Sequence, residues 1–163
     1  MSISKRIISV FDKIVGFPTA KAHCDIPCGI YDPYIAQYAA YTVLRMTNLI
    51  TGLEKDDPEY DHKLSRYTAT KDEFAEKTKH EIRILWGDYF KEEHEKDYPE
   101  ITKLVWKAMK LASQARQHID EKAANELVGT VLRIAEIFWA TKGVSTKRIT
   151  APYPTGGELV IPA

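Results

Sequence analysis

The chain has 163 residues, in which 23 Lys and Arg balance 23 Asp and Glu, and it contains two cysteines. This length fits one domain, with or without tails. Zero formal net charge gives no electrostatic drive toward nucleic acid or an anionic membrane surface, and two cysteines are too few for a disulfide scaffold. No apolar run approaches the roughly 20 residues of a membrane-spanning helix. We therefore expect neither a nucleic-acid-binding nor a membrane protein, and the chemistry must come from a local site.

Residues 1–22 differ from the rest of the chain. Lys5 and Arg6 precede a short apolar run that Asp12 and Lys13 interrupt, whereas a secretory signal needs about 7 to 15 unbroken apolar residues. The segment ends in a small-x-small pattern typical of a cleavage site, which would release residues 1–22 as a leader. The same residues also suit one short amphipathic helix of the mature fold. The interrupted run favours a cytoplasmic location.

Both cysteines lie in the segment His23-Cys24-Asp25-Ile26-Pro27-Cys28-Gly29-Ile30-Tyr31. Thiolates and imidazole are ligands for soft and borderline metals, and Pro27 and Gly29 suit a tight turn. Four readings stay open: buried apolar cysteines, a local disulfide, part of a zinc site, or a redox metal site. Zinc lacks an obvious fourth strong ligand, because the chain has no second cysteine-rich cluster.

Cleavage after Ala22 would change this chemistry. His23 would then offer a free amine and an imidazole, next to the backbone nitrogen of Cys24 and the thiolates of Cys24 and Cys28. Two nitrogens and two sulfurs in one plane, with imidazole available above it, favour Cu(II) or Ni(II) over zinc. Such an ion can change oxidation state, which zinc cannot.

Four amphipathic patterns follow the cysteine segment. They begin at Asp32-Pro33, near Leu64, at Tyr98-Pro99-Glu100 and near Asp120; the second runs to about Tyr89, and the last one ends before Gly143. Asp and Pro are favoured at helix starts, and Gly is favoured just after a helix end. The second pattern is weaker than the others, because Lys71 and several threonines interrupt its apolar face. Short connections between four such helices predict an all-α, antiparallel four-helix bundle over residues 32–145.

The last segment, residues 146–163, contains three prolines and two glycines. We expect an irregular C-terminal tail in which Leu159, Val160 and Ile161 pack on the bundle or on a neighbouring subunit. The predicted organisation is therefore a leader (1–22), a metal-binding hook (23–31), the bundle (32–145) and this tail.

Three blocks of sequence resemble one known family. The segment His-Cys-x-x-Pro-Cys-Gly-x-Tyr at residues 23–31 resembles the N-terminal hook of nickel-containing superoxide dismutases. The block Leu-Trp-Gly-Asp-Tyr-Phe-Lys at 85–91 and Ile-Phe-Trp at 137–139, followed by Thr141-Lys142, match further family blocks in the same order.

The resemblance implies a homohexamer of four-helix bundles with one nickel ion per subunit. It also implies the conversion of two superoxide ions to dioxygen and hydrogen peroxide, with nickel alternating between Ni(II) and Ni(III). Carried over residue by residue, it makes His23, Cys24 and Cys28 the metal ligands. Tyr31 and Tyr89 would line the approach to the metal and hold water or an incoming anion by O–H donation. A protease would have to remove the leader.

One feature departs from the family pattern. A Glu–Arg pair commonly supports the axial imidazole in this family, but ungapped placement puts Ala39 and Phe74 at those two positions. The group that holds the His23 imidazole is therefore not predicted. Groups around a metal ligand set its orientation and basicity.

Two alternatives to the enzyme stay open. One is a non-enzymatic helical bundle that binds nickel or copper through the same hook, and the other is a structural bundle with a disulfide-closed loop. The remaining histidines are predicted to be surface side chains: His62, His80, His94 and His118.

Overall fold

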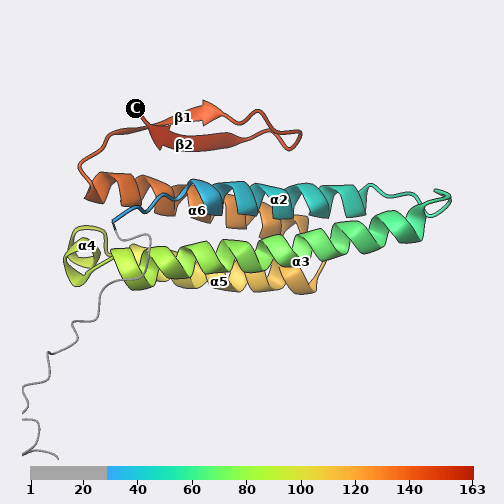
Figure 1. Cartoon of the computed structure of the whole chain (residues 1–163), viewed down its shortest axis with the longest axis horizontal. Coiled ribbons are helices and arrows are strands. Elements are labelled where there is room, and N and C mark those ends of the chain that lie inside the picture. The colour runs from blue at the N-terminus through green and yellow to red at the C-terminus, as the bar shows by residue number, and fades with distance from the viewer. Residues whose placement is uncertain (1–28) are drawn as a thin grey trace, which may run out of the picture.

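The computed structural model describes residues 29–163, and four long helices form its body. They are α2 (Tyr34–Thr51), α3 (Tyr60–Ile84), α5 (Ile101–Gln117) and α6 (Glu121–Thr141). Helix α2 packs on α3 and α6, and α5 packs on the same two helices, so that the four surround one core (Figure 1). The prediction of an antiparallel four-helix bundle is confirmed. Within residues 29–163, no helix has the length and apolar character needed to cross a membrane.

The core follows from the apolar stripes of these helices. Helix α2 buries Ala36, Ala39, Ala40 and Val43 completely, and such small side chains let neighbouring helices approach closely. The predicted cap at the start of α6 also forms. The Asp120 carboxylate accepts a hydrogen bond of 2.9 Å from the amide of Ala123 at the start of α6.

Two of the polar interruptions in α3, Lys71 and Thr78, are buried and hydrogen-bonded. Lys71 is only 2% exposed, and its ammonium group donates to the carbonyl oxygens of Ala115 and Arg116 at 2.5 and 2.8 Å, at the end of α5. The hydroxyl of buried Thr78 donates to the carbonyl of Phe74 at 2.8 Å. The weak apolar pattern of α3 therefore reflects polar groups that satisfy helix carbonyls inside the bundle.

Two shorter segments connect α3 to α5. A π-helical turn, η1 (Leu85–Tyr89), continues α3, and the short helix α4 (Glu92–Asp97) follows it. The sequence prediction had extended one helix to Tyr89 and had not included α4.

The C-terminal residues form a β-hairpin, so the prediction of an irregular tail was wrong. Strands β1 (Thr146–Thr150) and β2 (Glu158–Pro162) pair antiparallel, with Thr146 opposite Pro162 and Thr150 opposite Glu158. The prolines and glycines fall mainly in the connection between the strands, where turn residues belong. The predicted packing of this segment on the bundle does occur, because Leu159 and Val160 are buried.

Side chains of α2 fix the hairpin to the bundle. The amide of Gln37, which is 1% exposed, donates to the Val160 carbonyl at 3.0 Å and accepts from the Val160 amide at 2.9 Å. The Tyr41 hydroxyl donates to the Glu158 carbonyl at 2.5 Å and accepts from the Glu158 amide at 2.9 Å. Together the two side chains act as hydrogen-bonding partners for β2.

Candidate metal centre and its surroundings

The predicted metal ligands His23, Cys24 and Cys28 lie outside the described residues, as does the predicted leader. The described chain begins directly after Cys28 with Gly29, whose φ of +79° is a left-handed conformation that glycine adopts without strain. Tyr31 and the start of α2 follow at once. The hook sequence therefore joins the bundle at this end of α2 (Figure 1).

The structure brings the two predicted tyrosines together. Tyr31 precedes α2 and Tyr89 ends η1, and their ring centroids lie 5.7 Å apart although 58 positions separate them in the sequence. Both side chains are half-buried. The fold therefore brings both predicted tyrosines to the end of the bundle at which the hook sequence joins it.

The π-helical turn places Tyr89. The amide of Phe90 donates to the carbonyl of Leu85 at 2.9 Å, which is the wider i to i−5 pattern of a π-turn. One extra residue in a turn rotates the following side chains by about 100° relative to a continuous α-helix. Such turns are frequent at functional sites.

The end of α6 lies against Tyr89. The Tyr89 hydroxyl lies 2.8 Å from the Thr141 hydroxyl, which itself donates to the carbonyl of Phe138 at 2.7 Å. The ammonium of Lys142 lies 5.4 Å from the centre of the Tyr89 ring and 5.0 Å from that of Phe138. We call Tyr31, Tyr89, Thr141 and Lys142 the hook end of the bundle.

The prediction that His94 is an ordinary surface side chain was wrong. Its ring stacks on Tyr89 with centroids 5.4 Å apart and planes 22° from parallel, and its Nδ1 accepts a hydrogen bond from the Lys91 amide. Nothing in the sequence pattern placed His94 or Thr141 beside Tyr89. The family block containing Thr141-Lys142 was the one available signal for this end of α6.

Ala39 and Phe74 stand where the family pattern has an acid and an arginine. Ala39 is fully buried in α2, while Phe74 on α3 meets the ring of Tyr38 edge-on, with centroids 5.6 Å apart. Neither side chain can form an ion pair. At these two positions the described chain therefore has apolar packing between α2 and α3.

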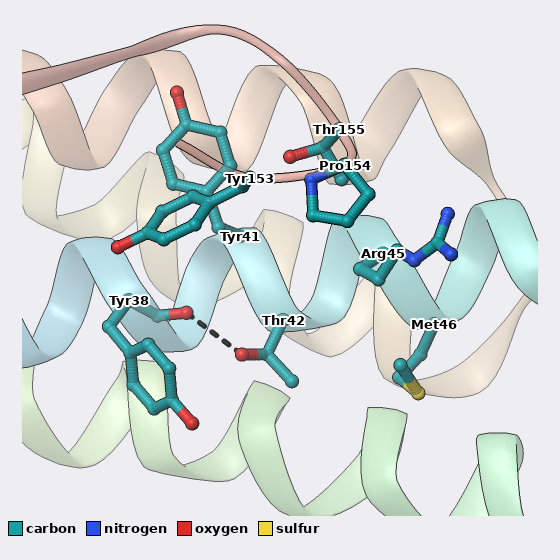
Figure 2. A pocket seen from close by; sticks show the side chains of 8 residues that line it. All are labelled: Tyr38, Tyr41, Thr42, Arg45, Met46, Tyr153, Pro154 and Thr155. Atoms are coloured by element: carbon teal, nitrogen blue, oxygen red, sulfur yellow. Dashed lines mark hydrogen bonds between the residues drawn. The ribbon is translucent and has the colours of Figure 1, made fainter. Parts of the chain in front are cut away.

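A cavity of about 220 Å³ lies away from the hook end, between α2 and the hairpin connection (Figure 2). Tyr38, Tyr41 and Tyr153 line one side of it and Arg45 and Met46 the other. Burial, and after it a hydrogen bond with Tyr34, raises the pKa of Tyr153 to about 12. Residues of the hairpin connection contribute to its wall, so this cavity belongs to the contact between hairpin and bundle.

Comparisons with known proteins give consistent matches. The family model described as nickel-containing superoxide dismutase matches residues 18–142. Two curated relatives are superoxide dismutases [Ni]. The one from Streptomyces coelicolor is 39% identical over 124 residues, which cover 76% of this chain and 91% of the relative. The one from Streptomyces seoulensis is 38% identical over 121 residues, which cover 74% and 88%.

Solved structures agree with these relatives. A native nickel superoxide dismutase structure superposes with a TM-score of 0.65 at 38% identity, covering 74% of this chain and 99% of that one. A structure of the enzyme in its oxidised nickel-ligation state gives 0.66 at 37% identity, with the same coverage. The matched part contains the hook sequence and the bundle, whereas the family match ends before the C-terminal hairpin.

Proposed function

The chain belongs to the nickel-containing superoxide dismutase family, and on this premise we propose that His23, Cys24 and Cys28 bind its nickel ion. The protein is an oxidoreductase that converts two superoxide ions and two protons to dioxygen and hydrogen peroxide at a nickel site. The alternative of a bundle that binds nickel or copper without turnover is not favoured, because the curated relatives are superoxide dismutases.

The available donors fit nickel. An N-terminal amine, an imidazole, a backbone nitrogen and two thiolates would form a nitrogen and sulfur set that suits Ni(II). When bound, nickel supplies a centre that alternates between the two-plus and three-plus states. The chain supplies the ligands, the turn at Gly29 that leads into the bundle, and the aromatic wall beside it.

Tyr31 and Tyr89 are the residues that we assign to the approach of superoxide. Their half-buried rings lie at the hook end, where the ammonium of Lys142 is the nearby cation among the described residues. A cation attracts a small anion, and rings packed this closely exclude larger molecules. The proximity of the two rings is the observation that supports this assignment.

The ligand assignment is tested by replacing both cysteines. We expect a Cys24→Ser, Cys28→Ser double variant to lose nickel and superoxide dismutation together, since neutral hydroxyls replace both thiolates. Elemental analysis and the rate of superoxide loss give the two readouts, and far-UV circular dichroism shows whether the bundle is intact. Full activity of this variant would overturn the assignment.

We further propose that a protease removes residues 1–22. While Ala22 is attached, the nitrogen of His23 is an amide, so one ligand is missing. Two chains that differ by a single residue isolate this effect: one starting at His23 and one starting at Ala22. We expect about one nickel ion per chain and activity only in the first. Equal activity of the two chains would contradict the proposal.

We propose a homohexamer as the assembled form. Four large apolar side chains just before α2 and in its first turns are exposed: Ile30, Tyr34, Ile35 and Tyr38. Exposed apolar side chains in one such segment are typical of an interface between subunits. Native mass spectrometry should find six copies, and Ile35→Glu should dissociate them, whereas Ile119→Glu, also at an exposed isoleucine, serves as the control. A monomeric nickel-loaded chain would contradict this assembly.

A cytoplasmic location is the last part of the proposal. It is supported by the interrupted apolar run of residues 7–11 and by the need for free thiolates, which a reducing compartment preserves. Cell fractionation tests it, and recovery of the processed chain outside the cytoplasm would contradict it.

A further inference from the structure

The direction of the hydrogen bond between Tyr89 and Thr141 is fixed by a second hydrogen bond. The two hydroxyl oxygens lie 2.8 Å apart, and the Thr141 oxygen lies 2.7 Å from the carbonyl oxygen of Phe138. A carbonyl oxygen only accepts, and a threonine hydroxyl carries a single proton, so that proton belongs to the bond with Phe138. The Thr141 oxygen then has only lone pairs left, and the Tyr89 phenol must donate to it.

We propose that Thr141 is a positioning residue that accepts the hydrogen bond of the Tyr89 phenol at the end of α6, which leaves Tyr31 as the tyrosine that donates to superoxide. Tyr31 makes no side-chain hydrogen bond to any residue between 29 and 163, so its proton is not committed within that part of the chain. This inference rests on the proposed role of the two tyrosines and divides that role between them.

The packing around Tyr89 keeps its phenol in this arrangement. The ring lies between Phe138, at a centroid distance of 4.6 Å, and the stacked ring of His94. Phe90 and Tyr31 contact further parts of it, at 5.3 and 5.7 Å. A ring held on several sides cannot swing its hydroxyl away from Thr141 without losing contacts that pack it.

Among residues 29–163, three charged or titratable groups lie against the Tyr89 ring. Lys142 approaches from the end of α6 with its ammonium 5.4 Å from the ring centre, His94 stacks on it from α4, and Tyr31 approaches from the segment before α2. The Lys142 ammonium cannot accept a hydrogen bond from Tyr89. The His94 imidazole stacks on the face of the Tyr89 ring and does not face the Tyr89 hydroxyl. Of the described residues around Tyr89, Thr141 is therefore the one that accepts a hydrogen bond from its phenol.

A spectroscopic test reads the hydrogen bond directly. The intensity ratio of the tyrosine Raman doublet distinguishes a phenol that donates from one that accepts, and subtracting the spectrum of a Tyr89→Phe chain isolates Tyr89. We expect a donor signature in the chain that starts at His23, its loss in Thr141→Val and its recovery in Thr141→Ser. An acceptor signature, or no change in Thr141→Val, would overturn the assignment. Since this readout needs no turnover, it separates this inference from the proposed function.

A second measurement tests the division of roles, with azide as the anion probe on the nickel-loaded chain. A lost hydrogen bond to an anion weakens binding roughly ten- to hundredfold, so we expect this loss in Tyr31→Phe. Tyr89→Phe should weaken azide binding several-fold less than Tyr31→Phe does. Equal losses in the two variants would show that both phenols donate and would overturn the proposal. A chain that binds no nickel would instead defeat the proposed function, while the Raman result would still decide the Thr141 assignment.

Discussion

The hook end and the C-terminal hairpin are attached to the same helix in different ways. At the hook end, Tyr31 and Tyr89 meet through ring contacts, and Tyr31 keeps a hydroxyl unpaired within residues 29–163. At the hairpin, Gln37 and Tyr41 each exchange two hydrogen bonds with the backbone of β2. The first region lies within the family match and the second beyond it. The difference indicates that α2 separates a region kept available for chemistry from one whose polar groups are fully used for stability.

Removing the hairpin should have the largest effect on stability, and it tests whether the two regions are independent. A chain ending at Ser145 loses the burial of Leu159, Val160 and Ala151, for which we expect a fall in unfolding free energy of about 3–6 kcal/mol. Nickel content and activity per nickel should be kept, because the hook end contacts none of these residues. Urea unfolding and superoxide assays measure the two quantities. Loss of activity in a chain that remains folded would show that the two regions are coupled.

Removing the Gln37 hydrogen bonds while keeping the hairpin should cause the next largest loss of stability. In Gln37→Ala the Val160 amide and carbonyl lose their partners inside a buried contact, which costs about 2–4 kcal/mol of unfolding free energy. Urea unfolding measures this change. The exposed Gln117→Ala on α5 is the matched control and should stay within about 0.5 kcal/mol. Similar values for the two variants would mean that the Gln37 bonds contribute little.

Two neighbouring glycines in the hairpin connection provide a finer test of the contact between the hairpin and α2. Gly156 and Gly157 both have positive φ, of +64° and +90°, so alanine strains the backbone at either position by about 1 kcal/mol. Only at Gly157 would the new Cβ lie 2.5 Å from the Tyr41 hydroxyl, whereas at Gly156 nothing lies within 4 Å. Gly157→Ala should therefore cost about 1–2 kcal/mol more in thermal unfolding than Gly156→Ala. Equal losses of stability in the two variants would mean that the strain comes from the backbone alone and not from the contact with Tyr41.

The smallest effect concerns pH. Burial raises the pKa of Glu136, but hydrogen bonds from Arg148 of the hairpin and from Arg133 outweigh it, so that the pKa lies below its ordinary value of 4.5. A lowered folded pKa adds stability above pH 4.5 that is lost as the pH falls through the folded value.

Glu136→Gln should remove this part of the acid dependence, with a loss below about 1 kcal/mol at neutral pH. Unfolding measured between neutral and acid pH gives the difference. Glu73→Gln, at an exposed carboxylate without an ion pair in the described chain, should keep the dependence unchanged. A flat difference between Glu136→Gln and the unmodified protein across that range would exclude this linkage.

The helices could be predicted closely because their signals are local. Asp120, the alanines of α2 and the glycine after α6 act on residues within one or two turns, and the observed helices begin and end within a few residues of the predicted positions. Lys71 was a harder case. Its partners are carbonyls more than 40 positions later, so the sequence pattern recorded only an interruption.

The surroundings of the candidate site could be predicted only in part. Tyr31 and Tyr89 were identified through the resemblance, and the structure places their rings together. Thr141 and His94 were missed, because their relation to Tyr89 depends on the extra residue in the π-turn and on where α6 ends. The hairpin was missed for a related reason, since its second strand is stabilised by Gln37 and Tyr41, more than 100 positions away.

The sequence by itself determined the four apolar helix stripes and supplied the candidate ligands of the hook, because helical periodicity and ligand chemistry depend on residues close together in the chain. Only the tertiary structure decided that the tail pairs as a hairpin on α2 and that the Tyr89 phenol has the Thr141 hydroxyl as its hydrogen-bond partner. Hydrogen bonds between distant segments have a direction and a geometry, and both are set only when the helices have packed.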